Sequence, residues 1–433
     1  MFQRPFIHHV QVYILSDTEA QSRRSSWLNK FQSKNSAFFI PKVNFIDKGI
    51  RDDNIHTMKI CYFGTYSKEY IRNRVIIKGL VNNGAEVIQC HYPMWSGVEP
   101  RIGQFKGIIG FLRLGVKFLV AYINLFFKAL EIQNKPDILL VGYTGHFDIP
   151  LAFLFSRLWR RPLVFDFHVS LWDTFVKDRM LVKKGSLMEK LLRFVDRTSI
   201  RLSDLLFLDT DHHIEFVANE FKVEKKKFRR FWVGEDPDFF HPVNTEKFRE
   251  FTVIYFGGFI PLHGMEVIVD AARRLQNKGI KFIFAGRGQL FEKTVKMAEG
   301  LKNIEFLGWV APEGLPELIS KSHVCLGIFG KADKARRVIP NKLYEGIACA
   351  IPVVTGDTPA IREVFEHRKN IFLCEIGSGE SLAEALLELK RNKELRKEIG
   401  VNGYKLFKRE FTPDRIGAEV LKELKKLKGG FHD

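Results

Sequence analysis

The sequence predicts an α/β protein made of two doubly wound domains, each a parallel sheet covered by helices on both faces. Short, continuously apolar runs alternate with helical stretches along most of the chain, which is typical of strands buried on both faces. The alternation stops at an acidic, proline-containing segment at 233–242 and then begins again. A length of 433 residues is sufficient for two such domains.

The first half contains five apolar runs that predict strands. They are expected at 59–64 (KICYFG), 85–92 (AEVIQCHY), 137–143 (DILLVGY), 162–170 (PLVFDFHVS) and 201–210 (RLSDLLFLDT). Helices are expected through 72–84, 105–131 and 150–160. Residues 1–57 show no periodicity, so we expect a loosely ordered extension followed by a first domain at 58–234. Met58 is a second candidate for the first residue of the protein.

The second half repeats the alternation, and we expect a second domain at 235–411. Strands are expected at 251–258, 281–288, 304–309, 324–329 and 352–357. Helices are expected through 263–275, 293–300, 315–322 and 341–350. A final helix at about 412–428 ends in a basic tail, which places a separate segment at 412–433.

Composition restricts the possible functions. Five cysteines form no C-x-x-C pair, which favours reduced core thiols in a cytoplasmic protein and makes a metal site improbable. The N-terminus lacks the apolar region of a signal peptide, and no run of about 18 apolar residues predicts a spanning helix. The formal charge of +18 suggests an anionic partner. Residues 101–200 hold 16 Lys+Arg against 8 Asp+Glu, a net +8.

Glycines follow two of the predicted strands in the second half. Gly257 and Gly258 end one strand, Gly264 starts a helix, and Gly286 and Gly288 end the next strand. Ligands of open parallel sheets bind at the carboxyl ends of strands, where glycine permits close approach of the backbone. Neither loop is a G-x-G-x-x-G or a P-loop, so ordinary βα turns are the alternative interpretation.

The segment IPNKLYEG (339–346) holds polar residues at the start of a helix that otherwise resembles core. We expect Asn341 to be the N-cap and Lys342 the first helical residue. The first-turn N–H groups and Lys342 would then face an anion, and the Glu345 carboxylate would suit the hydroxyls of a sugar. Alternatively, Glu345 only complements the helix dipole, which is worth about 0.3–1 kcal/mol.

Four segments in order resemble the retaining glycosyltransferases of family 4, which have the GT-B fold of two Rossmann-like domains facing each other across a cleft. The resemblance covers about 58–425 and is carried by LYEGIACAIPVVTGD, FGGFIPLHGMEVIVDAA, FLGWVAPEGLPELISKSHVCLGIF and VGEDPDFFHP. It implies transfer of a sugar from a nucleotide diphosphate sugar to an acceptor, without an obligatory metal or other cofactor. It also implies donor contacts at Gly257, Gly258, His263, Gly264, Arg287, Val310, Asn341, Lys342 and Glu345.

The same resemblance assigns residues in the first domain. The segment VFDFHVS resembles the strand that ends in a histidine facing the donor sugar, so His168 joins Glu345 as an expected catalytic residue. A core histidine is the alternative interpretation. The segment CYFGTYS resembles the loop that borders donor and acceptor, which places Gly64, Thr65 and Tyr66 on the acceptor side. Arg72 in the following helix either contributes charge to the site or is only solvated.

Three departures from the family pattern are visible. The family usually has two acidic residues separated by seven, and Arg337 stands where the first is expected, which leaves the transferred sugar undefined. Gly258 and His263 stand where the family's diphosphate loop usually has Arg and Lys. The loop before Asn341 carries four cations that either replace that charge or are solvated: Lys331, Lys334, Arg336 and Arg337.

The long helix expected at 105–131 is apolar except for one narrow polar stripe. Lys106, Arg113, Lys117, Asn124 and Lys128 fall within an arc of about 60° at 100° per residue. Two interpretations are open. The helix is a core helix with one solvated edge, or it is partly exposed and lies on an anionic membrane. The second would suit an acceptor displayed at a membrane, such as a lipid-linked glycan, and a peripheral location at the cytoplasmic membrane face.

Two other functions compete with a glycosyltransferase. A sugar-nucleotide epimerase has the same two-domain architecture but no separate acceptor, and the PNKLYE helix argues against it. A non-enzymatic nucleic-acid-binding protein would explain the +18 charge. We expect no nucleic-acid partner, because the sequence shows neither a helix-turn-helix nor an RNA-recognition signature.

Overall fold

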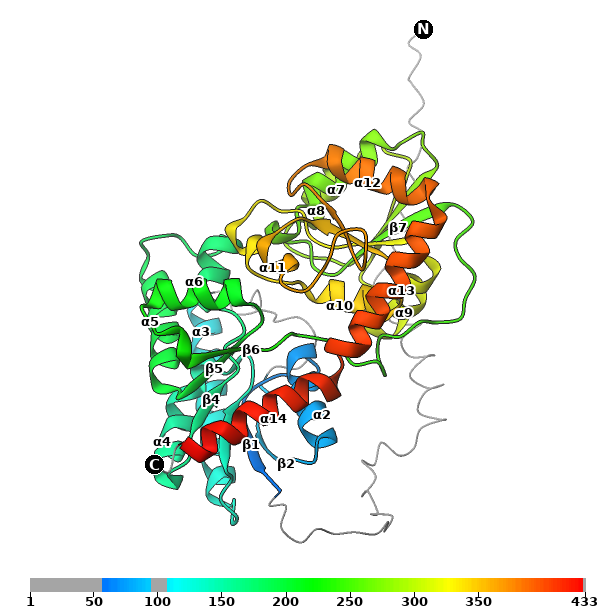
Figure 1. Cartoon of the computed structure of the whole chain (residues 1–433). Helices are drawn as coiled ribbons and strands as arrows, with labels where there is room; N and C mark the ends of the chain where they lie inside the picture. Colours follow the sequence, from blue (N-terminus) through cyan, green and yellow to red (C-terminus); the bar gives the residue numbers. More distant parts are fainter. Residues whose placement is uncertain (1–56, 95–106, 431–433) are drawn as a thin grey trace, which may run out of the picture. The chain divides into compact units, whose positions relative to one another are not determined.

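A computed structural model describes residues 57–94 and 107–430 of the chain, and Thr57 onward forms one compact unit (Figure 1). Of the extension predicted at 1–57, only Thr57 is among the described residues. Lys106, which belongs to the predicted polar stripe, also lies outside them. Two six-stranded parallel sheets flanked by helices confirm the predicted fold class. The five cysteines are all buried, free thiols.

The first sheet has the strand order β2-β1-β3-β4-β5-β6. Its strands are β1 (Lys59–Gly64), β2 (Glu86–His91), β3 (Ile138–Val141), β4 (Leu163–Phe165), β5 (Leu205–Leu208) and β6 (Phe228–Arg230). The first five are at the predicted positions. The sequence analysis missed β6, because it is a three-residue edge strand in which only Phe228 is buried.

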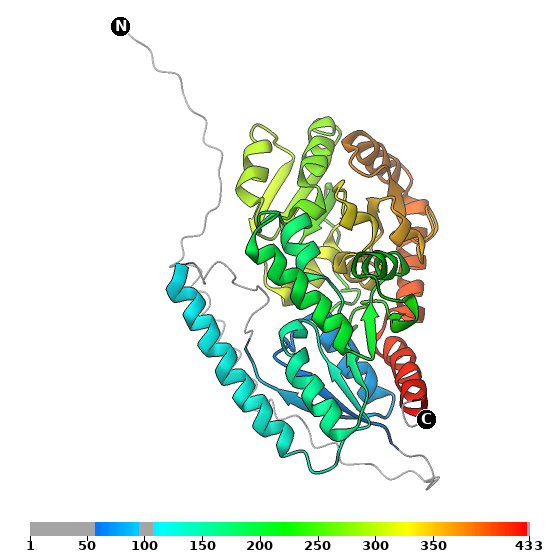
Figure 2. The same ribbon diagram turned by 90° about the vertical axis from the view of Figure 1, so that its left-hand side faces the viewer.

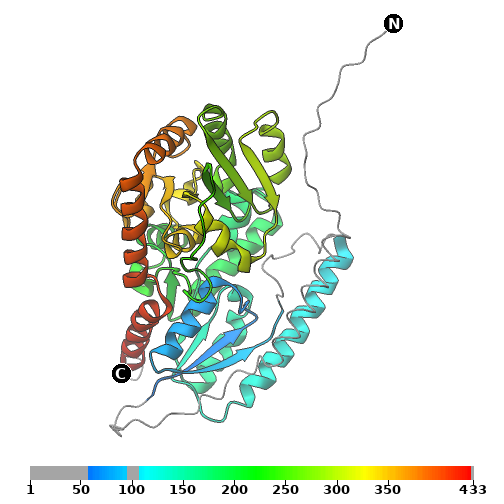
Figure 3. The same cartoon turned by 90° about the vertical axis from the view of Figure 1, so that its right-hand side faces the viewer.

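Helices cover both faces of this first sheet. They are α2 (Ile71–Asn82), α3 (Gly107–Leu130), α4 (Ile149–Trp159), α5 (Leu187–Leu202) and α6 (Asp211–Phe221). Local capping explains two of the starts, since the Ser186 hydroxyl accepts from the Glu189 N–H and the Thr210 hydroxyl accepts from the His213 N–H. Helix α3, drawn in cyan, runs along the outside of the domain (Figures 2 and 3).

The second sheet has the order β12-β11-β10-β7-β8-β9. Its strands are β7 (Phe251–Phe256), β8 (Ile280–Ala285), β9 (Ile304–Gly308), β10 (Val324–Leu326), β11 (Val353–Gly356) and β12 (Phe372–Cys374). Its helices are α7 (Met265–Arg274), α8 (Phe291–Met297), α9 (Leu315–Lys321), α10 (Asn341–Ala348), α11 (Pro359–Arg362), α12 (Gly379–Arg391) and α13 (Lys393–Glu410). The short strand β12 was also missed from the sequence.

The strand orders identify one topological switch point in each sheet. In the first, the chain moves from β1 to β2 and then crosses to β3 on the other side of β1. In the second, it runs from β7 through β9 and then crosses to β10 on the other side of β7. Ligands of doubly wound sheets bind at the carboxyl ends of the strands beside such a point. The loops after β7 and β10 are therefore the first place to look for a site.

The last helix, α14 (Pro413–Gly430), packs against α2 of the first domain. Two glycines permit this close approach. A Cβ atom added at Gly79 would lie 2.1 Å from the carbonyl oxygen of Pro413, and one added at Gly417 would lie 2.1 Å from the carbonyl carbon of Gly79. The chain thus crosses between the domains twice, after β6 and again between α13 and α14.

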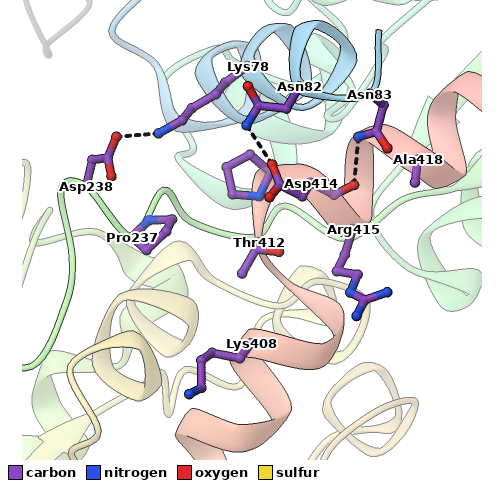
Figure 4. Close-up of a pocket in the computed structure, with 11 residues that line it drawn as sticks. Lys78, Asn82, Asn83, Pro237, Asp238, Lys408, Thr412, Asp414, Arg415 and Ala418 are labelled. Carbon is purple, nitrogen blue, oxygen red and sulfur yellow. Dashed lines mark hydrogen bonds and ion pairs between the residues drawn. The ribbon is translucent and has the colours of Figure 1, made fainter. Parts of the chain in front are cut away.

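A pocket of about 700 Å³ lies where these two crossings meet α2 (Figure 4). The Lys78 ammonium bonds to the Asp238 carboxylate at 2.5 Å, and the Asn82 amide donates to the Asp414 carboxylate at 2.6 Å. Lys78 and Asn82 belong to the carboxyl-terminal end of α2, so the pocket lies at the opposite edge of the sheet from the strands' carboxyl ends. It is separate from the site described next.

Candidate donor site at the second switch point

The start of α10 is one residue earlier than the sequence predicted. Pro340 has an extended backbone (φ −71°, ψ 147°) and occupies the N-cap position, so Asn341 is the first helical residue. The predicted N-cap role of Asn341 is therefore wrong. Proline is well suited to this boundary because its φ is fixed and it has no N–H to satisfy. No side chain caps this end of the helix.

Lys342 connects α10 to the loop after β7. Its side chain is buried, with the ammonium 3.8 Å from the ring centroid of Tyr255 and 3.3 Å from Nδ1 of His263. The same ammonium would lie 3.8 Å from a Cβ atom added at Gly257. Burial lowers the pKa of Lys342 to about 7. A bound anion nearby would raise this pKa again and favour the charged ammonium. Lys342 is therefore suited to binding an anion.

His263 is fixed by neighbours within the same loop. Its Nδ1 lies 2.7 Å from the Tyr255 hydroxyl, and the Gly258 carbonyl oxygen is a second neighbour. Burial lowers the pKa of His263 well below its usual value, and the charge of Lys342 acts in the same direction. His263 is therefore neutral, so Lys342 alone contributes a titrating cation to this contact.

Glu345 lies one turn into α10, on the same helix as Lys342. The residue is largely buried but keeps some exposed surface, and its carboxylate accepts no hydrogen bond from the described residues. Burial raises the pKa of Glu345 to about 8, and the nearby Glu235 carboxylate raises it further, while Lys342 acts in the opposite direction. A carboxyl group without a partner at a strand's carboxyl end can accept hydrogen bonds from ligand hydroxyls.

Glycine is required in the loops after β7 and β8. Gly257 has φ +105° and Gly286 has φ +143°, and a Cβ atom at Gly286 would lie 2.0 Å from the Gly257 carbonyl oxygen. A Cβ atom at Gly264 would lie 2.4 Å from the Gly330 backbone nitrogen. The two strand ends therefore meet backbone to backbone. The exposed Arg287 extends from this junction toward β9, where its guanidinium would lie 3.5 Å from a Cβ atom at Gly308.

His168 lies three residues beyond β4 in the first domain, with a left-handed backbone (φ +49°). Its Nε2 is 3.3 Å from the Tyr70 hydroxyl, and its buried Nδ1 has no partner among the described residues. Burial lowers the pKa of His168 to about 3, and the charge of Arg72 acts in the same direction. Burial raises the pKa of Tyr70 to about 12 while the side chain of Asn341 acts in the opposite direction, which places Tyr70 near the start of α10.

Arg72 has a structural role that the sequence analysis did not weigh. Its guanidinium has no exposed surface and bonds the Asp166 carboxylate at 2.9 and 3.0 Å. A third nitrogen donates to the carbonyl oxygens of Phe231 and Trp232 at 2.6 and 3.1 Å. The expectation that Arg72 is solvated is therefore wrong. It ties α2 to the end of β4 and to the connection between the domains.

The loop after β1 is held by an aspartate that sequence analysis missed. The Asp148 carboxylate accepts from the Thr65 N–H at 2.7 Å, and a Cβ atom at Gly64 would lie 2.5 Å from the same carboxylate. Tyr66 is fully buried, and its hydroxyl donates to Gln89 at 3.4 Å. These contacts give Tyr66 a place in the core of the domain, whereas Gly64 and Thr65 remain at the carboxyl end of β1.

The comparisons with known proteins concern mainly the second domain. Residues 250–392, which contain the glycine loops and α10, match the family model described as glycosyl transferases group 1. Over this segment the chain is similar to the group 1 glycosyltransferases. The matched segment contains every expected donor-contact residue.

The chain spans less than half the length of three curated relatives that it matches. An uncharacterized glycosyltransferase of Methanocaldococcus jannaschii is 27% identical over 183 residues, which is 40% of this chain and 48% of that protein. An N-acetyl-α-D-glucosaminyl L-malate synthase of Bacillus anthracis is 23% identical over 38% of this chain and 42% of that protein. A phosphatidyl-myo-inositol mannosyltransferase of Mycobacterium leprae is 29% identical over 36% and 42%.

Solved structures support the GT-B architecture of this chain. HepE of Anabaena, solved with UDP, has a TM-score of 0.59 at 14% identity and covers 86% of this chain and 100% of that one. Sucrose-phosphate synthase of Thermosynechococcus elongatus has a TM-score of 0.63 at 14% identity, with the same coverage. At this identity the likeness concerns the fold.

Two of the cations that stand before α10 pair with the first domain. The guanidinium of Arg337 bonds the Asp173 carboxylate at 2.9 Å and lies 3.6 Å from the ring centroid of Phe216. The buried Lys334 ammonium donates to the Thr174 hydroxyl at 2.7 Å and lies 3.8 Å from the Asp178 carboxylate. From the sequence we expected these two cations to be solvated or to supply charge to the donor site. Neither interpretation included their pairing with the first domain. Lys331 and Arg336 are exposed.

A second buried pair lies at the end of β5. His213 Nδ1 is 2.6 Å from the Asp209 carboxylate, and the Nε2 of His213 is buried without a partner among the described residues. The Thr210 hydroxyl donates to the carbonyl oxygen of Arg337, and the backbone N–H groups of Asp211 and His212 donate to Glu363 at 2.9 Å. The carboxyl ends of the two sheets are therefore joined by direct contacts. The spacing D-x-x-x-H (209–213) was the signal that could have revealed the Asp209–His213 pair.

Proposed function

We propose that this chain is a retaining glycosyltransferase, which transfers a sugar from a nucleotide diphosphate sugar to an acceptor carried by a lipid at a membrane surface. One observation carries the proposal. Lys342 and Glu345 lie one turn apart on α10, beside loops in which Gly264 and Gly286 leave no room for a side chain. A cation at a helix start suits a diphosphate, and a carboxyl one turn deeper suits the ribose hydroxyls.

The remaining donor contacts follow from this placement. The Gly257–Gly286 junction would allow the backbone to approach the diphosphate. Arg287, after β8, and Val310, after β9, would border the base. Gly258, His263 and Gly264 would shape the loop that holds Lys342. Asn341 would approach the donor sugar together with His168, since Tyr70 bonds to His168 and lies near Asn341.

In the proposed reaction, the bond between the anomeric carbon and the diphosphate oxygen breaks, and a bond to the acceptor oxygen forms on the same face of the sugar. The acceptor proton passes to the leaving diphosphate. The protein therefore contributes position and charge. Lys342 would become protonated beside the diphosphate and stabilise its developing charge. His168, neutral because of its burial, would orient a sugar hydroxyl by hydrogen bonding. No step requires a metal.

The relatives and solved structures differ in the nucleotide sugar that their names give. HepE was solved with UDP and with UDP-glucose, whereas a Mycobacterium tuberculosis relative is described as a GDP-mannose-dependent mannosyltransferase. Arg337 is turned toward Asp173, so it would not replace the family's sugar-contacting Glu. We propose a location at the cytoplasmic membrane face, in accordance with the five free thiols. No helix in the described part of the chain is long and apolar enough to cross a membrane.

A ligand screen followed by one variant tests the proposal. UDP, GDP, ADP and their sugars are compared for their effect on the melting temperature, where a ligand at a hundred times its Kd stabilises by about 2.7 kcal/mol. Lys342→Ala should weaken binding of the best diphosphate at least tenfold and that of its nucleoside less than twofold, because only the diphosphate carries phosphate. Equal losses would assign Lys342 a purely structural role.

Glu345→Ala should abolish transfer while the protein stays folded. Conversion of the sugar without an acceptor would instead support an epimerase.

A further inference from the structure

Helix α3 has three distinct faces, which follow from 100° of rotation per residue. Ala121, Leu125 and Ala129 have no exposed surface and pack against the first domain. On the opposite side, apolar residues occupy an arc of about 120°. Among them, Val116 and Leu119 are each 60% exposed, Ile123 48%, Phe127 58% and Leu130 50%.

The interpretation of α3 as a core helix with one solvated edge is therefore wrong. A helix that buries one side in the domain normally presents charged or polar residues on the other side. Here the outward side is apolar along most of its length. Leu154 and Leu158 of the neighbouring α4 are also 53% and 65% exposed, and the two helices meet where the rings of Phe126 and Phe155 lie 5.5 Å apart. An apolar surface of this extent marks an interaction site.

Cations line one edge of this apolar face. Arg113 and Lys117 are exposed, and Lys128 is exposed while its ammonium donates to the His91 carbonyl oxygen at 2.9 Å. With Asn124 they form the stripe between the buried face and the apolar face. No Asp or Glu occurs between Gly107 and Leu130. The partner must therefore combine an apolar surface with negative charge.

The positive charge of the stripe argues against two other partners for the apolar face of α3. A second copy of the same face would bring like charges together. Residues 1–56 hold eight Lys+Arg and five Asp+Glu, a net +3, so this segment is also not complementary to the stripe. An anionic bilayer meets both requirements, because acyl chains accept the apolar side chains while headgroups accept the cations.

We propose that α3 lies flat on an anionic lipid bilayer, with Val116, Leu119, Ile123, Phe127 and Leu130 inserted between the lipids and Arg113 and Lys117 at the headgroups. The inference gives the proposed function a specific membrane-binding surface. It is nevertheless tested without donor or acceptor, so vesicle binding and sugar transfer can fail separately.

The experiment is co-sedimentation of the full chain with vesicles of phosphatidylcholine, alone or mixed with phosphatidylglycerol, at low and high salt. The parent protein should bind the anionic vesicles, should bind them more weakly at high salt and should not bind the neutral ones. Leu119→Gln/Phe127→Gln and Arg113→Glu/Lys117→Glu should each lower the partition coefficient at least tenfold. All four positions are exposed, so both variants should keep the parent's melting temperature within a few degrees.

Two control variants make the same chemical changes elsewhere. Val81→Gln/Val401→Gln alters exposed apolar residues of α2 and α13, and Lys397→Glu/Lys405→Glu reverses two exposed cations of α13. Both should bind vesicles like the parent. The proposal is overturned if the parent ignores anionic vesicles, if neutral vesicles bind it equally, or if the control and α3 variants behave alike. A parent dimer that the Leu119→Gln/Phe127→Gln variant dissolves would show that a second copy covers this face.

Discussion

Lys342 and Glu345 illustrate how burial prepares two side chains of α10 for a ligand. Burial lowers the pKa of Lys342 to about 7 and raises that of Glu345 to about 8. Both groups are thus near the point where charged and neutral forms are equally stable at neutral pH. In the proposed function, a diphosphate would favour the charged lysine and ribose hydroxyls would favour the ionised carboxylate. Donor binding would therefore complete the charges of the site.

His168 should act on the reacting sugar more than on donor affinity. We expect His168→Asn to lower kcat at least tenfold while the Kd of the donor changes less than twofold, because the proposed contact is to the sugar and not to the nucleotide. Steady-state kinetics and calorimetry with the donor measure the two quantities. If both are unchanged, His168 is a core histidine.

The pKa of His168 also gives a pH signature. A folded pKa of about 3, far below the usual 6.5, means that the unfolded chain binds a proton that the folded protein does not. The free energy of unfolding should therefore fall as the pH drops from about 6.5 toward 3, and it should fall less in His168→Asn. Denaturation at several pH values tests this. Equal slopes would show that His168 titrates normally.

Sequence reasoning identified residues that contrast with their neighbours in the chain, and it missed contacts between residues that are far apart in the chain. Lys342 and Glu345 stood out because the surrounding helix is apolar, which is a local contrast. The partners of Asp148 and Arg337 lie 83 and 164 residues away, so nothing in the local sequence predicted these contacts. The burial of Arg72 depends in the same way on Asp166, 94 residues later.

At the scale of elements, the loop before α10 connects the two domains through the Arg337–Asp173 ion pair. The side chains are 12% and 1% exposed, so their interaction is screened little by water. A double-mutant cycle with Arg337→Gln and Asp173→Asn should give a coupling free energy of about 1–3 kcal/mol in chemical denaturation.

The exposed pair Arg362–Asp357 serves as the control for that cycle. Its side chains are 57% and 36% exposed, so Arg362→Gln and Asp357→Asn should show no resolvable coupling. If the Arg337–Asp173 coupling is no larger than that of the control, the ion pair does not hold the two domains together.

Long or strongly patterned elements were predictable, and short ones were not. Ten strands and the helix α3 were expected within a few residues of their observed positions. The strands β6 and β12 have only three residues each, too few for a pattern to emerge. The exposure of α3 was not decided by its sequence, because an apolar helix has the same composition whether protein or lipid covers it.

At the scale of the whole molecule, the Gly79–Gly417 contact should control the stability of the first domain. Gly417→Ala places a methyl group where only 2.1 Å is available to the backbone of α2, so we expect the free energy of unfolding to fall by about 1–3 kcal/mol. Urea denaturation of the full chain measures it.

Gly429→Ala, in the same helix, is the matched control. A Cβ atom there meets nothing within 4 Å, so stability should be unchanged or slightly higher, because alanine favours helices more than glycine does. Equal effects of the two substitutions would show that α14 does not depend on its close contact with α2.

The position of α14 also has a consequence for the order of synthesis. Asn83, at the end of α2, bonds the Asp414 carbonyl oxygen, 331 residues later in the chain. At translation rates of 5–20 residues per second, roughly 20–60 s pass between the emergence of these two segments. During that time the surface of α2 that α14 will cover is exposed on the nascent chain. The first domain is thus completed only when the last helix of the chain emerges, because α14 covers α2.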